Sequence, residues 1–197
     1  MKVTKYTHAC VRLEHGGRVL VIDPGEWSPD VSLEDADAVL VTHEHLDHVD
    51  EDRLAALDLP VFAPADAVIE GLSTIGVTAG QDFTAAGFAV RAVGGRHTTI
   101  ADGLPNCANL GYVVDQDVYH PGDSLHIPDV PVRTLLIPAQ ASWFKVGEAV
   151  DFARAIRPER SFQVHDGQIN ERGLEGVNRW LGRADAGYRY LAPGESL

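Results

Sequence analysis

Four side chains that can bind metal ions lie within six consecutive positions of the chain. They follow the pattern HxHxDH, with His43, His45, Asp47 and His48 as the candidate ligands. In an extended turn, residues two positions apart point to the same side, so His43 and His45 can converge on one cation. Asp47 and His48 can face a second cation nearby. Neutral imidazole and carboxylate are ligands expected for zinc, and they also suit manganese or iron.

Three further candidate ligands come later in the sequence. His97, Asp123 and His165 each follow a short run of β-forming residues, so each is predicted to stand near the end of a strand. Alone, each would more often be a loop or capping residue than a metal ligand. Together they supply what the first motif lacks, which is a third ligand for each cation and a carboxylate able to bridge two. The alternative interpretation of the motif is a solvated, histidine-rich helix start.

The rest of the chain predicts the elements that must position these side chains. Short strands are predicted at residues 3–6, 10–14, 19–22, 38–42, 61–63, 83–93, 111–114, 118–120, 134–137 and 161–164. Helices are predicted at residues 50–57, 65–72, 146–156 and 171–181. Strands interleaved with helices in this way indicate two sheets with helices packed outside them. Since no repeat or linker interrupts the chain, we expect one domain over residues 1–197.

Composition narrows the class of partner. The 197 residues carry 16 Lys and Arg against 29 Asp and Glu, a net charge of −13, which argues against a non-specific nucleic-acid binder. No apolar stretch approaches the roughly 18 residues of a membrane span, and residues 1–17 lack the apolar core of a signal peptide. We therefore expect a cytoplasmic protein that does not bind membranes. The oligomeric state stays open.

Taken together, these motifs make the chain resemble the metallo-β-lactamase superfamily. The resemblance runs from the opening strands, with Thr7-His8-Ala9 and Val21-Ile22-Asp23-Pro24, through the HxHxDH motif to His165. It implies an α+β fold, a four-layer αββα sandwich that holds one or two metals at one edge of its sheets. Within the superfamily, the chain is similar to small single-domain hydrolases related to ascorbate-6-phosphate lactonase, which open with a comparable Gly-His-Ser segment.

The resemblance also implies a complete ligand set for two divalent ions, with Zn²⁺ expected first and Mn²⁺ or Fe²⁺ as alternatives. The first ion would be bound by His43, His45 and His97, the second by Asp47, His48 and His165, and both by a bridging Asp123. His8 matches a histidine that lies near the site in the related hydrolases, where it could contact substrate. Alternatively, it is a strand residue hydrogen-bonded to its neighbours.

The activity implied is hydrolysis of a small ester-type substrate, either a lactone or a phosphodiester. Two cations about 3.5–4 Å apart can share a bridging hydroxide as the nucleophile. Asp47 and Asp123 would be the catalytic carboxylates, with Asp47 orienting the hydroxide and taking a proton. Arg96 and Lys145 could attract an anionic substrate, or they could be ordinary solvated cations. The alternative function is that of a catalytically silent, metal-stabilised scaffold or ligand sensor.

Other residues are expected to support the site or to lie outside it. Asp23 should accept hydrogen bonds from the backbone of the ligand loop, and His120 should support the site from behind its ligands. Cys10 and Cys107 are interpreted as buried small hydrophobes outside the site.

The sequence leaves the lining of the substrate pocket open at two places. Trp143 either walls the pocket or belongs to the core. Asp166-Gly167 follows His165 where related hydrolases have an aromatic residue, and we expect this change at the rim.

Overall fold

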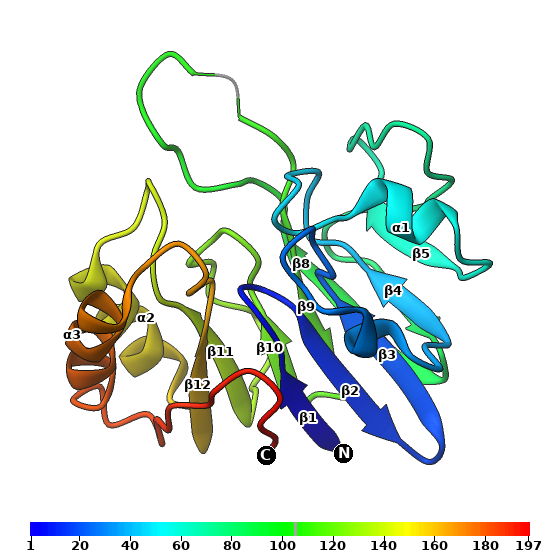
Figure 1. The fold of residues 1–197 in the computed structure, drawn as a ribbon. Coiled ribbons are helices and arrows are strands. Elements are labelled where there is room, and N and C mark those ends of the chain that lie inside the picture. Colours follow the sequence, from blue (N-terminus) through cyan, green and yellow to red (C-terminus); the bar gives the residue numbers. More distant parts are fainter. Residues whose placement is uncertain (105) are drawn as a thin grey trace.

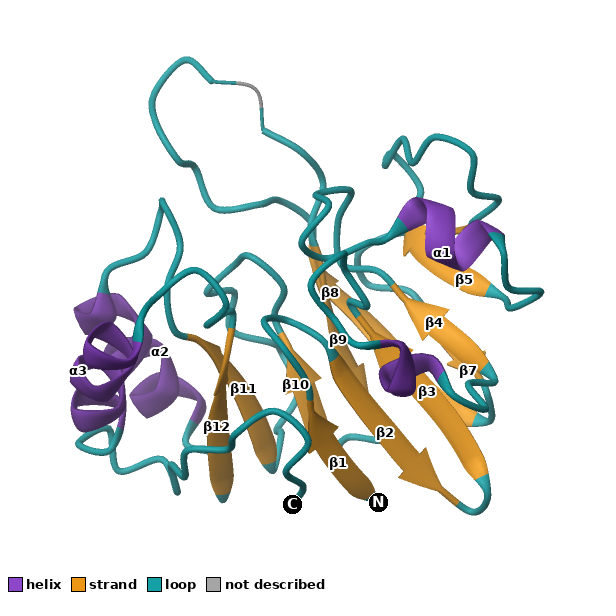
Figure 2. Ribbon diagram, in the orientation of Figure 1, coloured by secondary structure: helices purple, strands orange, loops and turns teal. Residues whose placement is uncertain are grey.

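The computed structural model describes residues 1–104 and 106–197. Two six-stranded sheets lie face to face, and the helices lie on their outer sides (Figures 1 and 2). The predicted αββα sandwich is therefore confirmed. The two termini lie next to each other, and the backbone N–H of Val3 donates to the carbonyl oxygen of Leu197 at 3.3 Å.

The first sheet has the strand order β1-β2-β3-β4-β5-β6. Its strands are β1 (Lys2–Lys5), β2 (Val11–His15), β3 (Arg18–Ile22), β4 (Ala38–Leu40), β5 (Val61–Pro64) and β6 (Ile75–Val77). Strands β1 to β3 pair antiparallel, whereas β3, β4, β5 and β6 pair parallel. Because parallel strands end at the same edge, the loops that follow β3 and β4 begin side by side.

The second sheet has the order β12-β11-β10-β9-β8-β7. Its strands are β7 (Asp82–Ala85), β8 (Phe88–Gly94), β9 (Leu110–Val114), β10 (Val118–His120), β11 (Thr134–Pro138) and β12 (Arg160–Val164). Strands β7 to β10 pair antiparallel, and β10, β11 and β12 pair parallel. The loops after β10, β11 and β12 therefore also start at one shared edge.

The helices cover the outer faces of the sheets. The 3-10 helix Asp30–Leu33 and α1 (Glu51–Ala55) lie over the first sheet, and α2 (Val146–Ile156) and α3 (Glu171–Leu181) lie over the second. The bounds of α2 and α3 agree with the predicted helices. Of the described residues, none belongs to a helix with the length and apolar character needed to cross a bilayer.

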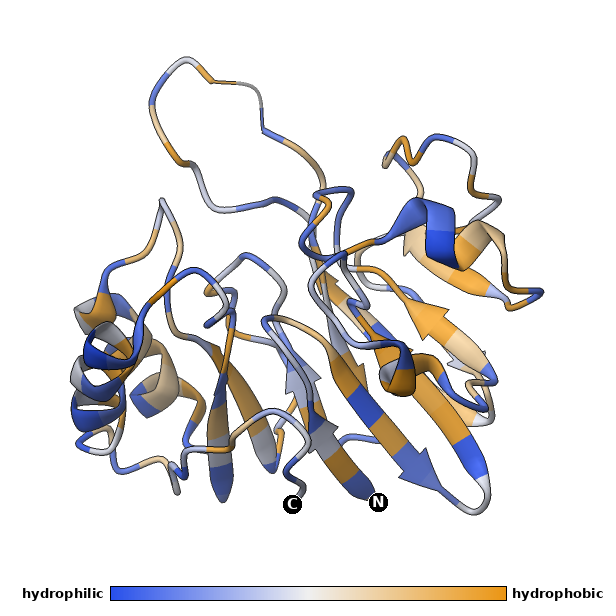
Figure 3. Cartoon of the chain, viewed as in Figure 1, coloured by the Kyte–Doolittle hydropathy of each residue, from blue (hydrophilic) through white to orange (hydrophobic). Residues whose placement is uncertain are grey.

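Apolar residues on both faces of the central strands hold the layers together. In β3, Leu20 and Ile22 lie in the core between the sheets, whereas Val19 and Val21 pack under the outer layer that includes Leu54 of α1. Such strands are apolar along their whole length because both faces are buried. Figure 3 shows this concentration of hydrophobic residues on the strands, with hydrophilic residues predominating along α3.

Two predictions about individual elements were wrong, and one strand was not predicted. Residues 83–93 form the β7–β8 hairpin around an Ala86-Gly87 turn and not one strand. Residues 65–72 form turns and not a helix, because the segment is largely exposed (Val68 is 76% exposed) and so short a helix needs packing to be stable. Strand β6 was not predicted, because Gly76 interrupts its β-branched pattern.

Candidate metal centre

The structure brings all seven predicted metal ligands together at one edge of the sandwich, with His8 beside them. The ligand loop, residues 41–50, follows β4 and carries the HxHxDH motif. His97, Asp123 and His165 lie in the loops that follow β8, β10 and β12. His8 lies in the turn between β1 and β2. Five separate chain segments therefore contribute to one cluster.

The cluster contains three groups of ligand atoms, and the third, made of His43, His48 and Asp123, links the other two. In the first, one nitrogen from each of His43, His45 and His97 lies within 4.8 Å of the others. The His43 Nε2 and His45 Nδ1 atoms are 3.0 Å apart. In the second group, ligand atoms of His8, Asp47, His48 and His165 lie within 4.8 Å of one another. This division matches the predicted assignment, except that His8 joins the second group.

Asp123 lies between the two groups. Its Oδ1 atom is 3.2 Å from His48 Nε2 and 3.0 Å from His165 Nε2. Its Oδ2 atom is 3.3 Å from His97 Nε2, in the first group. One buried carboxylate thus faces members of both groups, which is the position a bridging ligand requires.

Hydrogen bonds on the outer side of the cluster fix the tautomers of four histidines. In each of them Nδ1 faces an oxygen that accepts its proton. The pairs are His43 with Thr42 Oγ1 at 3.1 Å, His48 with Asp23 Oδ2 at 2.7 Å, His97 with Thr98 O at 2.6 Å, and His165 with Gln140 O. The Nε2 lone pair of each neutral ring is consequently free and points into the cluster, as in most metal-binding histidines.

The inner atoms of the cluster need a positive charge between them. Within the described part of the chain, His48 Nε2, His165 Nε2 and Asp123 Oδ1 are buried and find no hydrogen-bond partner. Burial alone would lower the pKa of His48, but Asp123 and Asp23 on either side outweigh it and raise that pKa well above 6.5, so without a cation this ring holds a second proton that a bound cation would displace. Burial lowers the pKa of His43 well below 6.5, so its ring is neutral and able to bind a cation. Buried acceptors that face one another in this way fit a metal ion.

Asp23 holds the ligand loop in place, as the sequence predicted. Its Oδ1 atom accepts from the backbone N–H of Thr42 at 2.7 Å, and its Oδ2 atom accepts from the Thr42 hydroxyl at 2.7 Å. Gly25 is required nearby, because a Cβ there would lie 2.2 Å from the backbone of Asp47. The Asp23-Pro24-Gly25 turn therefore lets the ligand loop approach β3 closely.

Backbone conformation also marks this edge. His8, Asp23 and His165 have φ angles of 62°, 52° and 58°, in the left-handed region that non-glycine residues rarely adopt. Such conformations persist only where the surrounding structure determines them, and they cluster at functional sites. The sequence held no signal for these three angles.

The support expected from His120 is present. Its Nε2 donates to the carbonyl oxygen of Ala9 at 2.8 Å, and its Nδ1 accepts from the backbone N–H of Gly122 at 3.1 Å. It thus connects the turn that carries His8 with the loop that carries Asp123, and lies outside both ligand groups.

The interpretation of Cys107 was wrong. Cys10 is buried, but Cys107 is only partly buried and its Sγ lies 3.9 Å from His45 Nε2, beside the first group. Burial and the nearby Glu44 raise the pKa of Cys107 to about 11, so its thiol is protonated at neutral pH. The loop after β8 carries Cys107 back over the ligand loop, an arrangement that local sequence does not encode.

Trp143 is a site residue that the sequence left undecided. Its indole Nε1 donates to Asp123 Oδ2 at 3.0 Å, and its ring is buried. Its position after β11, whose end lies at the same edge as those of β10 and β12, is the signal that could have indicated this role. The indole fixes the orientation of the carboxylate that faces both groups.

Removing this indole N–H should weaken metal binding. We expect Trp143→Phe to fold normally and to bind zinc about tenfold more weakly, because partners that orient metal ligands typically contribute this much. Competition with a fluorescent chelator would measure the affinity, and Trp180→Phe on the exposed side of α3 is the matched control. Equal affinities for the parent and Trp143→Phe would exclude this role.

A hollow of about 510 Å³ lies beside the ligand loop, and its lining includes Glu26, Glu44 and Glu51. The two cations considered for substrate binding are both exposed, and Lys145 pairs with Glu148 at 3.2 Å. Arg96 lies next to His97 in the sequence. The charge around the hollow is therefore mainly negative.

Comparisons with known proteins agree with this geometry. A family model for the β-lactamase superfamily domain matches residues 2–165. Protein Rv0786c of Mycobacterium tuberculosis is 37% identical over 177 residues, or 84% of each chain. A UPF0173 metal-dependent hydrolase of Thermoplasma volcanium is 32% identical over 143 residues, which are 66% of this chain and 64% of that protein. The fold is similar to that of Igni18, a metallo hydrolase from Ignicoccus hospitalis, with a TM-score of 0.76, 21% identity and coverage of 100% and 97%.

Proposed function

The chain belongs to the metallo-β-lactamase superfamily as a metal-dependent hydrolase, and we propose that it hydrolyses a small ester-type substrate with two divalent cations. The observation that carries this proposal is the position of Asp123 between two groups of histidine nitrogens that point into the cluster. A closed structural site would need only one group of ligands and no bridging carboxylate.

The proposed ligands follow the two groups. His43, His45 and His97 would hold the first cation, Asp47, His48 and His165 the second, and Asp123 both. The mixture of imidazole and carboxylate ligands supports zinc, with manganese or iron as alternatives. When bound, such cations would activate water as a nucleophile and polarise the bond that it attacks.

Asp123 and Asp47 would have different roles in the reaction. The Asp123 side chain is only 6% exposed and would stay between the cations, whereas the Asp47 side chain is 14% exposed and can reach an incoming water molecule. Burial alone would raise the pKa of Asp47, but the hydrogen bond to His8 and the nearby histidines outweigh burial and lower it to about 2. Asp47 is therefore ionised at neutral pH, able to orient water and to accept its proton.

The charge around the hollow bears on the choice of substrate. Glutamates on its lining would repel a phosphodiester and would tolerate an uncharged lactone. An anionic substrate would depend on Arg96, the exposed cation next to His97. We therefore favour a lactone, and Arg96→Ala distinguishes the two cases, because it should raise KM only for an anionic substrate.

Two further features support the proposed cellular location and the single-domain organisation. The free cysteines, Cys10 and Cys107, support a cytoplasmic location, where thiols stay reduced. Pairing of Thr4 with Ser196 supports one domain over residues 1–197, because it ties the end of the chain to β1.

Removal and return of metal test the function. Full-length protein should hydrolyse at least one member of a panel of lactones and phosphodiesters, lose this activity after dialysis against a chelator, and regain it with zinc or manganese. Metal-loaded protein that binds a substrate-like anion but hydrolyses no member of the panel would contradict the hydrolase function. That result would favour a scaffold or ligand sensor.

A further inference from the structure

We propose that His8 does not bind metal, and that it acts as a hydrogen-bond donor that positions Asp47. The inference rests on the proposed function, because it takes Asp47 to be a ligand of the second cation. It assigns His8 a role different from those of the five other histidines in the cluster.

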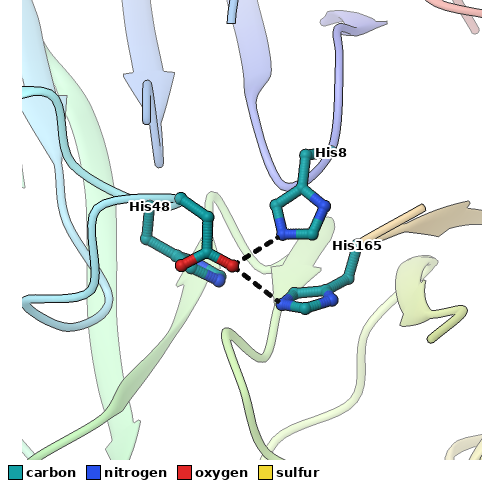
Figure 4. Close-up of side chains that lie close together, drawn as sticks. His8, His48 and His165 are labelled. Atoms are coloured by element: carbon teal, nitrogen blue, oxygen red, sulfur yellow. Dashed lines mark hydrogen bonds and ion pairs between the residues drawn. The ribbon is translucent and has the colours of Figure 1, made fainter. Parts of the chain in front are cut away.

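Distance alone would make His8 a fourth ligand of the second group. A ring nitrogen of His8 lies within 4.8 Å of ligand atoms from Asp47, His48 and His165, and the residue is 1% exposed. The ring centroids of His8 and His165 are 3.9 Å apart. Figure 4 shows the two rings side by side, each with a nitrogen directed at the same carboxylate oxygen, which is Oδ2 of Asp47.

The protons on the His8 ring argue against that role. Its Nδ1 atom accepts a hydrogen bond from the backbone N–H of Gly167 at 3.0 Å. A backbone N–H can only donate, so Nδ1 must be the unprotonated nitrogen and the proton of the neutral ring must lie on Nε2. That proton is directed at Asp47 Oδ2, 3.0 Å from Nε2.

The proton and the lone pair of the His8 ring are therefore on the opposite nitrogens from those of His48 and His165. In His48 and His165 an outward Nδ1–H donates to an oxygen, which leaves the inward Nε2 with a free lone pair. In His8 the outward Nδ1 accepts, so the inward Nε2 carries a proton and has no lone pair to offer. To bind a cation through Nε2, His8 would have to move its proton to Nδ1, where it would oppose the N–H of Gly167.

The chain fixes this orientation through two turns that are held together. The backbone N–H of His165 donates to the carbonyl oxygen of His8 at 2.9 Å, and the buried Lys5 pairs with Asp166 at 3.0 Å. Gly167 lies close to the His8 ring, because a Cβ there would lie 3.1 Å from His8 Nδ1 and the ring would have to shift to accommodate it. Asp166 and Gly167, which were expected at the rim, also serve this junction.

Two substitutions of His8 separate the roles of its nitrogens. In His8→Asn the amide oxygen can still accept from Gly167, but no donor reaches Asp47. In His8→Gln the amide nitrogen can take the place of Nε2. We expect both variants to bind as many zinc ions per chain as the parent, with His8→Asn binding about tenfold more weakly and His8→Gln close to the parent.

Loss of one zinc equivalent in both variants would show that His8 is a ligand and would overturn the inference, as would parental affinity in His8→Asn. Long-range ¹H–¹⁵N spectra of the parent provide a second test, which reports the tautomer directly. His8, identified by the signal missing in His8→Asn, should show a proton on Nε2 and none on Nδ1, before and after zinc is added. A shift of the proton to Nδ1 on zinc binding would overturn the inference.

These outcomes are distinguishable from failure of the proposed function. If the parent binds no metal, the proposed function fails, whereas the spectrum of the metal-free protein still tests the donor role of His8.

Discussion

Asp123→Asn should reduce kcat/KM by on the order of 10³-fold, the largest loss that we expect from a single substitution. The Oδ1 atom of Asp123 faces the Nε2 atoms of His48 and His165, and its Oδ2 atom faces His97. Asparagine removes the negative charge that both cations would share. Its NH₂ group would also place protons where a ligand atom is required.

The activity of Asp123→Asn would be measured with the best substrate of the panel at saturating zinc, with circular dichroism to confirm folding. Asp151→Asn is the control, because that side chain is 81% exposed on α2 and belongs to none of the ligand groups. A loss of less than tenfold in Asp123→Asn would contradict the bridging role.

Lys5→Met should lower the free energy of unfolding by about 3–5 kcal/mol, because it leaves a buried carboxylate without its partner. The Lys5 side chain is 0% exposed and the Asp166 side chain 8% exposed, and their charged atoms are 3.0 Å apart. The Lys5 ammonium also donates to the carbonyl oxygen of Tyr6 at 2.9 Å. Chemical denaturation of metal-free protein would measure the loss.

Lys2→Met provides a control in the same strand. Lys2 pairs with Glu14 at 2.8 Å, but its side chain is 58% exposed, and exposed pairs of this kind contribute about 0–1 kcal/mol. The contrast between the two lysines therefore isolates the effect of burial. Similar losses in Lys2→Met and Lys5→Met would contradict this explanation.

The sequence predicted which residues gather in the cluster because their signals are local. HxHxDH places four ligands in one loop, and His97, Asp123 and His165 each follow a strand. Strands that run parallel end at one edge, so residues that follow them meet without further information. The agreement of α2 and α3 with their predicted bounds has a similar local cause, because each has a helical pattern and clear ends.

What the sequence could not supply depends on contacts between distant segments. Trp143 reaches Asp123 from another loop, and Cys107 returns to His45 at the end of the loop after β8. The tautomer of His8 depends on the N–H of Gly167, 159 positions away. Neither composition nor local pattern encodes such contacts, and for the same reason the Lys5–Asp166 pair was not predicted.

Metal content measured by elemental analysis, on full-length protein purified without an affinity tag, tests the two-cation site most directly. We predict two equivalents of metal per chain in the parent, falling towards one in His48→Ala. One equivalent or none in the parent, persisting after incubation with zinc and manganese, would contradict the two-cation site and favour a metal-stabilised scaffold.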